Sequence, residues 1–227
     1  MASETFGVPV LKVCGIQTPT EAALAIRCGA HSLGFVGSSS AGAKALAEED
    51  IIMMAPMVPV GTSTFLLVSA VEVEAIIEPW TRSGARIVQL CDAVPVPVLR
   101  ELRRRVPEGG LAQVIRASGP EVIPYARAAS RVVDWLLVDA GEELPHWDPA
   151  RTSRDEAWKL CRRIRDEAFS PVLLAGGLHA GNVAEAIRVV RPYGVEVGAE
   201  MRTCGKLDEA KLRAVLAAMK SALLQEN

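Results

Sequence analysis

Short apolar runs alternate with amphipathic segments along the whole chain. Eight runs have the length and composition of buried strands. They cover residues 9–13, 32–36, 64–68, 86–90, 111–116, 132–138, 171–174 and 194–197. Most of the intervening segments have helical spacing of apolar residues. The predicted helices cover residues 21–28, 45–54, 71–80, 95–106 and 121–129, with a further helix from about Asn182.

This alternation predicts a parallel sheet in which each strand is followed by a helix. We expect the sheet to close into a (β/α)₈ barrel that forms a single domain over residues 1–227, and an open, doubly wound sheet is the alternative. The length of 227 residues and the 50% hydrophobic content suit such a barrel.

In a (β/α)₈ barrel, the carboxyl ends of all eight strands meet at one mouth, where the active site lies. Polar residues and glycines follow several of the predicted strands. They are Cys14, Lys44, Gln89, Arg116, Asp139, Gly176, Gly177 and Glu200. We expect these residues to converge although the sequence separates them.

Cys14 stands where the first apolar run ends and a turn begins. Most free cysteines are buried packing residues, so position alone does not give this thiol a chemical role. Lys12 lies two residues earlier and therefore on the same face of the strand. A nearby ammonium group favours the thiolate, so we expect Lys12 to help lower the pKa of Cys14.

Asp139 ends the sixth apolar run. A lone Asp at such a position is often a turn or capping residue. Together with a thiol at the end of another strand, it becomes a candidate acid/base couple.

Gly176 and Gly177 follow the seventh strand and precede a helix. Backbone amides at a helix entrance are suited to bind phosphate, and barrels often bind phosphate after the seventh and eighth strands. A double glycine also serves tight turns, so its location is better evidence than the motif itself.

Composition excludes several other functions. The net charge is −2, with 25 basic and 27 acidic residues, and aromatic residues make up 4%. These values argue against nucleic-acid binding and against an anionic membrane as partners. The five cysteines and three histidines are too scattered for a metal site. An odd number of cysteines, without a signal peptide or a transmembrane stretch, predicts a cytoplasmic protein.

Several motifs resemble those of the phosphoribosylanthranilate isomerase family of tryptophan biosynthesis. They occur in the family's order and extend over nearly the whole chain. They are K-V-C-G-I at 12–16, G-A-H-S-L-G-F-V at 29–36, V-Q-L at 88–90, L-L-V-D at 136–139, L-A-G-G-L at 174–178 with Asn182-Val183 following, and G-K-L-D at 205–208.

The resemblance implies a (β/α)₈ isomerase that performs an Amadori rearrangement of an N-linked phosphoribosyl amine without metal or organic cofactor. It implies that Cys14 is the general base and Asp139 the general acid. We expect a phosphorylated small-molecule substrate and a monomer or homodimer. Strand-end position and resemblance together nominate the substrate-binding and phosphate-binding residues. They are Lys12, Lys44, Gln89, Arg116, Gly176, Gly177, Ala199 and Glu200.

The chain also departs from the family's usual motifs. The family's S-P-R motif after the second strand is absent, which leaves Lys44 as the nearby cation. After the eighth strand, Gly198-Ala199-Glu200 replaces the usual S-S-G. A carboxylate there repels phosphate unless Glu200 turns away or pairs with Arg202.

Two further departures concern other strand ends. Cys91 stands where a histidine usually follows V-Q-L, and the altered loop after Asp139 contains Trp147, a candidate for stacking on a ligand. Three outcomes are consistent with these changes: a divergent isomerase, a relative that acts on another substrate with or without phosphate, or a noncatalytic barrel that binds a ligand or partner. Lyase or aldolase chemistry would need a strand-end lysine or a metal, and Lys12 is the one such lysine in the sequence.

Overall fold

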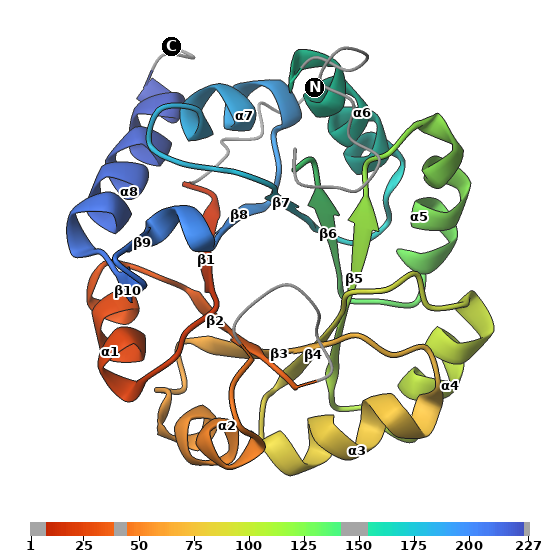
Figure 1. The fold of residues 1–227 in the computed structure, drawn as a ribbon. Helices are drawn as coiled ribbons and strands as arrows, with labels where there is room; N and C mark the ends of the chain where they lie inside the picture. The colour runs from red at the N-terminus through yellow and green to blue at the C-terminus, as the bar shows by residue number, and fades with distance from the viewer. Residues whose placement is uncertain (1–7, 39–44, 142–153, 225–227) are drawn as a thin grey trace.

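Eight parallel strands form a closed barrel in the computed structural model, which describes residues 8–38, 45–141 and 154–224 (Figure 1). The strands are β1 Val10–Cys14, β2 Ser32–Val36, β3 Ser63–Val68, β4 Ile87–Leu90, β5 Gly110–Arg116, β6 Trp135–Asp139, β7 Val172–Ala175 and β8 Gly194–Val197. Closure is direct, because β8 pairs with β1, with Lys12 opposite Glu196. The predicted barrel is therefore confirmed, and the open sheet is wrong.

Helices surround the barrel on the outside (Figure 1). They are α1 Pro19–Arg27, α2 Glu48–Met54, α3 Val73–Ser83, α4 Val96–Arg105, α5 Ile123–Ala129, α6 Arg154–Glu167, α7 Val183–Val190 and α8 Glu209–Leu224. Shorter elements are the 3₁₀ helices η1 Ala55–Met57, η2 Pro120–Val122 and η3 Ala199–Met201, and the hairpin strands β9 Arg202–Thr203 and β10 Lys206–Leu207. None of the described helices has the length and apolar composition that crossing a membrane requires.

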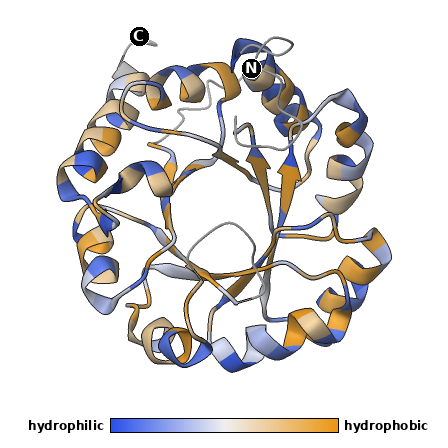
Figure 2. Cartoon of the chain, viewed as in Figure 1, coloured by the Kyte–Doolittle hydropathy of each residue, from blue (hydrophilic) through white to orange (hydrophobic). Residues whose placement is uncertain are grey.

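Most strand residues are hydrophobic, as expected for a parallel sheet covered by helices (Figure 2). The outward side chains pack under the helices, and Leu11, Val13 and Leu33 are fully buried there. The inward side chains fill the barrel itself. Phe65 and Trp135 meet edge to face inside it, with ring centroids 6.0 Å apart. Apolar packing thus fills much of the barrel interior.

Several element boundaries differ from the prediction by one to three residues, and two of these differences have identifiable reasons. Helix α1 begins at Pro19 rather than residue 21, because the Thr18 hydroxyl accepts the Glu21 N–H at 3.1 Å and caps the helix. Strand β6 begins at Trp135 rather than residue 132. The side chain of Asp134 accepts the Leu111 N–H at 2.8 Å and pairs with Arg103 at 2.6 Å, so the chain turns before the strand starts.

Candidate active site

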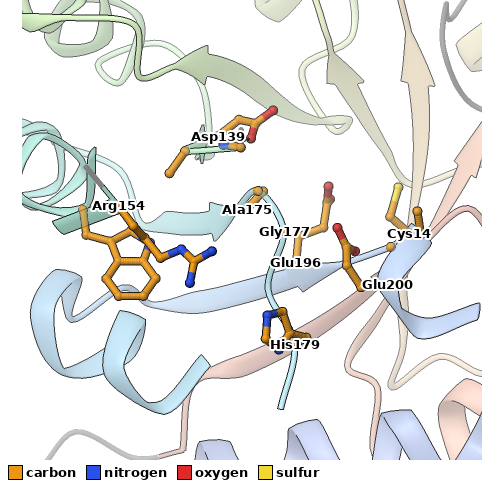
Figure 3. A pocket seen from close by; sticks show the side chains of 14 residues that line it. Cys14, Asp139, Arg154, Ala175, Gly177, His179, Glu196 and Glu200 are labelled. Atoms are coloured by element: carbon orange, nitrogen blue, oxygen red, sulfur yellow. Dashed lines mark hydrogen bonds between the residues drawn. The ribbon is translucent and has the colours of Figure 1, made fainter. Parts of the chain in front are cut away.

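A cavity of about 510 Å³ opens at the carboxyl ends of the strands (Figure 3). Its walls come from β1, β6, β7 and β8, from the loops that follow them, and from the start of α6. The lining residues are Cys14, Asp139, Ala140, Gly141, Arg154, Trp158, Ala175, Gly176, Gly177, His179, Glu196, Gly198, Ala199 and Glu200. The barrel therefore brings together six of the residues nominated from sequence: Cys14, Asp139, Gly176, Gly177, Ala199 and Glu200.

Three of the other four nominated residues are not among the residues that line this cavity. Lys12 and Gln89 are buried inside the barrel, with 1% and 2% of their surfaces exposed. Arg116 is exposed at the end of β5, in register with Asp139, but outside the cavity wall. Lys44 lies outside the described residues.

Lys12 is held by two polar side chains within the barrel. Its ammonium group forms an ion pair with Glu196 and donates a hydrogen bond to Gln89 Oε1 at 2.6 Å. Burial lowers the pKa of Lys12, but the Glu196 carboxylate together with Cys14 and Cys91 outweighs this effect, and the net pKa is raised. Lys12 therefore stays charged and is paired inside the barrel, and its nomination as a substrate-binding residue stays a prediction.

Cys14 is the last residue of β1, and its side chain reaches the cavity. Gly34 on β2 makes room for it, since a Cβ at that glycine would lie 3.0 Å from the sulfur. Burial raises the pKa of the Cys14 thiol to about 12, and Glu196 adds to this rise while Lys12 opposes it. Lys12 lowers this pKa, as expected, but burial and Glu196 outweigh its contribution.

Glu196 is a charged residue of the cavity that sequence analysis did not nominate. It lines the cavity together with Cys14 and forms an ion pair with the buried Lys12, and its side chain is 13% exposed. The signal was present in the sequence, because Glu196 is a charged residue within a short apolar strand. The same signal marks Lys12, and only the pairing of β1 with β8 reveals that the two charges neutralise each other.

Asp139 ends β6 and lines the opposite part of the same cavity. Its Oδ1 accepts a hydrogen bond from the Gly141 N–H at 2.8 Å. The other oxygen is bonded to no described residue. The carboxyl group is thus oriented by its own loop and faces a cavity that also contains the Cys14 thiol.

Glycine is needed at the two positions after β7 for different structural reasons. At Gly176, which has φ +103°, a Cβ would lie 2.2 Å from the Gly141 nitrogen and 2.7 Å from Asp139 Oδ1. Only glycine therefore allows the β7 loop to pack against the Asp139 loop. At Gly177, with φ +61°, a Cβ would meet open space, so this glycine supplies backbone conformation instead.

Asn182 fixes the loop that follows these glycines. Its side chain accepts the His179 N–H at 2.8 Å and donates to the Gly177 carbonyl at 2.9 Å. This buried amide explains why an asparagine follows the L-A-G-G-L motif. His179 is thereby placed on the cavity wall.

Glu200 lies in η3 and points toward the cavity (Figure 3). The proposed pairing of Glu200 with Arg202 is wrong, because Arg202 binds the Glu21 carboxylate at 2.8 and 2.9 Å and the Gly15 carbonyl. Within the described part of the chain, Glu200 has no hydrogen-bond or ion-pair partner. The Glu200 carboxylate therefore lines the cavity without a described partner that neutralises its charge.

Arg154, Trp158 and His179 are cavity residues that sequence analysis did not nominate. Arg154 and Trp158 lie one turn apart on α6, so they share a helix face. Trp147, the candidate for ligand stacking, lies outside the described residues. In the described ranges, no three His, Cys, Asp or Glu side chains are grouped to hold a metal ion.

A family model described as N-(5'-phosphoribosyl)anthranilate (PRA) isomerase matches residues 11–218. The chain belongs to this isomerase family. A family member from Desulforudis audaxviator is 33% identical over 94% of this chain and 99% of its own length. N-(5'-phosphoribosyl)anthranilate isomerase 2 of Methanosarcina mazei is 32% identical over 89% of this chain and 90% of its own.

Solved structures of the PRA isomerase family have the same fold. The phosphoribosylanthranilate isomerase of Thermotoga maritima superimposes with a TM-score of 0.78 at 22% identity, covering 94% of this chain and 99% of that one. The isomerase of Thermococcus kodakaraensis gives a TM-score of 0.77 at 22% identity, with the same coverage of both chains. At this identity the likeness establishes the barrel alone.

The Glu21–Arg202 pair generates a prediction about stability. Burial raises the pKa of Glu21, but hydrogen bonds from Arg202 and from the Gln17 and Leu207 N–H groups outweigh it and lower the net pKa. Because the two side chains are only 12% and 15% exposed, Glu21→Gln should lower the free energy of unfolding by about 1–3 kcal/mol at pH 7. Urea unfolding measures this difference.

The sign of the pH dependence follows from the lowered pKa. The Glu21 carboxylate stabilises the fold above its unfolded-state pKa, and this contribution is lost as pH falls through the lower folded-state pKa. The difference between wild type and Glu21→Gln should therefore shrink in acid. Glu209→Gln is the control, since the exposed Glu209–Arg213 pair should contribute much less than the Glu21–Arg202 pair. Equal effects of the two substitutions would contradict the prediction.

Proposed function

We propose that this protein isomerises N-(5'-phosphoribosyl)anthranilate to the corresponding 1-amino-1-deoxyribulose 5-phosphate. The observation that supports this most is the placement of Cys14 and Asp139 on the walls of one cavity, at the ends of different strands. Membership of the isomerase family supplies the reaction class. The assignment includes a cytoplasmic role in tryptophan biosynthesis.

A ligand complex of a structural relative supports the substrate class. One solved phosphoribosylanthranilate isomerase contains reduced 1-(o-carboxyphenylamino)-1-deoxyribulose 5-phosphate, a phosphorylated ketose derivative. That protein shares 22% identity with this chain, with a TM-score of 0.75. We propose a ligand of the same kind for the cavity at the mouth of this barrel.

In the proposed first step, Asp139 acts as general acid. It donates a proton to the furanose ring oxygen, the bond from that oxygen to C1 breaks, and the nitrogen lone pair forms a C1=N iminium. The Gly141 N–H bonds to one oxygen of Asp139 and leaves the other directed elsewhere. A single carboxyl group can therefore be oriented by its loop and still face the substrate.

In the second step, Cys14 acts as general base. Its thiolate removes the C2 proton, and the C–H electron pair moves to the iminium nitrogen to give an enolamine. Loss of the proton on the C2 oxygen and protonation at C1 complete the ketose. The substrate's own nitrogen accepts the electrons in this scheme, so the scheme includes no metal and no organic cofactor.

The high pKa of Cys14 restricts when this step occurs. With a pKa of about 12, the thiol is protonated in the cavity at neutral pH, so it must first lose this proton to solvent before it can take the C2 proton as a thiolate. A positive charge nearby favours the thiolate. We expect the iminium formed by ring opening to supply that charge, so that ring opening precedes proton removal.

Adding N-(5'-phosphoribosyl)anthranilate to the pure protein and following the loss of its fluorescence tests the proposed reaction. Cys14→Ala should reduce turnover at least about 100-fold, because it removes the base that takes the C2 proton. Cys204→Ala, which removes an exposed thiol, should retain wild-type turnover. Full activity in Cys14→Ala would exclude this thiol from the mechanism, and an inactive wild type would refute the proposed function.

Asp139→Asn should slow ring opening at least about 100-fold, because an amide cannot protonate the ring oxygen. The Asn side chain can still accept the Gly141 N–H, so the loop should keep its structure. Single-turnover kinetics measure the step. Asp92→Asn is a matched control, since Asp92 lies just after β4 and does not line the cavity. An unchanged rate in Asp139→Asn would assign the acid to another group.

The Lys12–Glu196 pair should set the pH dependence of kcat/KM, which reports ionisation in the free enzyme. Glu196→Gln removes the negative charge that raises the Cys14 pKa, so the rise of kcat/KM with pH should shift to lower pH. Lys12→Met removes the positive charge that lowers this pKa and should shift the profile the other way. Shifts in the same direction for both variants would contradict this account. Thermal unfolding of each variant controls for loss of the buried pair.

A further inference from the structure

The Glu196 carboxylate has one oxygen that no described residue engages. Its Oε2 is bound by the ammonium group of Lys12, and no hydrogen bond links Oε1 to the described part of the chain. The described side-chain oxygen and nitrogen atoms that are buried without a partner belong to Glu48, Gln113 and Ser170, so Oε1 keeps some exposed surface. Because Glu196 lines the cavity, this oxygen is a hydrogen-bond acceptor available to a ligand there (Figure 3).

The ion pair with Lys12 fixes the position of this acceptor. Lys12 is 1% exposed and also donates a hydrogen bond to Gln89 Oε1 at 2.6 Å, so its ammonium group is held on two sides. A carboxylate that is bound at one oxygen keeps the other oxygen in place before a ligand arrives. Little side-chain freedom is then lost on binding, which favours affinity.

The acceptor lies beside the proposed general base. Cys14 ends β1, and Glu196 is on β8, the strand that pairs with β1. Both side chains line the cavity, and the carboxylate is close enough to raise the pKa of the thiol. A ligand carbon that contacts the sulfur therefore has Glu196 next to it.

The reacting carbon of the proposed substrate carries a group that matches this acceptor. C2 bears both a hydroxyl group and the hydrogen that Cys14 removes in the proposed second step. The two substituents have a fixed tetrahedral relation, so a hydrogen bond that holds the hydroxyl also sets the direction of the hydrogen. A carboxylate is a stronger acceptor for a hydroxyl than a neutral group is.

We propose that Glu196 Oε1 accepts a hydrogen bond from the C2 hydroxyl of the substrate and thereby directs the C2 hydrogen toward the Cys14 sulfur. This inference rests on the proposed function, which supplies the substrate. It makes Glu196 a specificity-determining residue for ligands with a hydroxyl at C2. Lys12 is then a positioning residue, because it holds the carboxylate that contacts the ligand.

Two ligands that differ only at C2 test this contact without requiring turnover. They are reduced 1-(o-carboxyphenylamino)-1-deoxyribulose 5-phosphate, in which reduction leaves a hydroxyl at C2, and its 2-deoxy analogue. Isothermal titration calorimetry measures both affinities. Wild type should bind the hydroxylated ligand at least about tenfold more tightly, because the analogue leaves a carboxylate oxygen without its donor.

Two variants assign the preference to the carboxylate rather than to the ion pair. Lys12→Met/Glu196→Met replaces the pair by apolar side chains and should bind the two ligands within about twofold of each other. Lys12→Met alone is the matched control, since it breaks the same ion pair but keeps the acceptor. It should still prefer the hydroxylated ligand by at least about fivefold. Glu196→Ala repeats the test if the double variant fails to fold by circular dichroism.

The inference and the proposed function fail through different results. Equal affinities in wild type, or an undiminished preference in Lys12→Met/Glu196→Met, would overturn the contact and leave the reaction in place. A wild type that prefers the hydroxylated ligand but does not convert N-(5'-phosphoribosyl)anthranilate would support the contact and refute the proposed function. A wild type that binds neither ligand would refute both.

Discussion

The ion pair between Lys12 and Glu196 joins the two strands that close the barrel and lies next to the thiol at its mouth. The two residues are opposite each other in the register of β1 and β8, the strands that complete the ring. Lys12 is almost fully buried, so removal of Glu196 would leave a cation inside the barrel with Gln89 and the Phe65 ring as its remaining partners. An unpaired buried charge is costly. An arrangement that separates β1 from β8 while Lys12 stays buried would therefore carry this cost.

The same pair controls the electrostatics of Cys14. If Lys12 were unpaired, its charge would favour the thiolate form of Cys14, which lies two residues further along the same strand. Glu196 cancels that effect, and burial then keeps the thiol protonated. A neutral thiol is also less prone to oxidation or to reaction with electrophiles than a thiolate. The Lys12–Glu196 pair thus joins two strands of the barrel. In the proposed mechanism it also leaves Cys14 dependent on the positive charge of the substrate iminium.

Local sequence patterns predicted most of the fold but only part of the site. The apolar runs identified all eight strands, because a parallel sheet covered by helices is apolar on both faces. Strand-end position found Cys14 and Asp139 for a related reason, since topology places every strand end at one mouth. The ion pairs near the cavity could not be predicted from the sequence. Glu196 and Lys12 are 184 positions apart, and Arg202 and Glu21 are 181 apart, so no local pattern links them.

The charge of the cavity follows from these distant pairings rather than from composition. Arg202 is two residues from Glu200 and would be its natural partner on the basis of sequence alone. It turns instead toward α1, where Glu21 also accepts the Leu207 N–H at 3.1 Å and so joins both hairpin strands to that helix. The interaction that fixes the hairpin therefore removes the cation from η3. Glu200 has no described partner that compensates its charge, because Arg202 is bound to Glu21 on the other side of the hairpin.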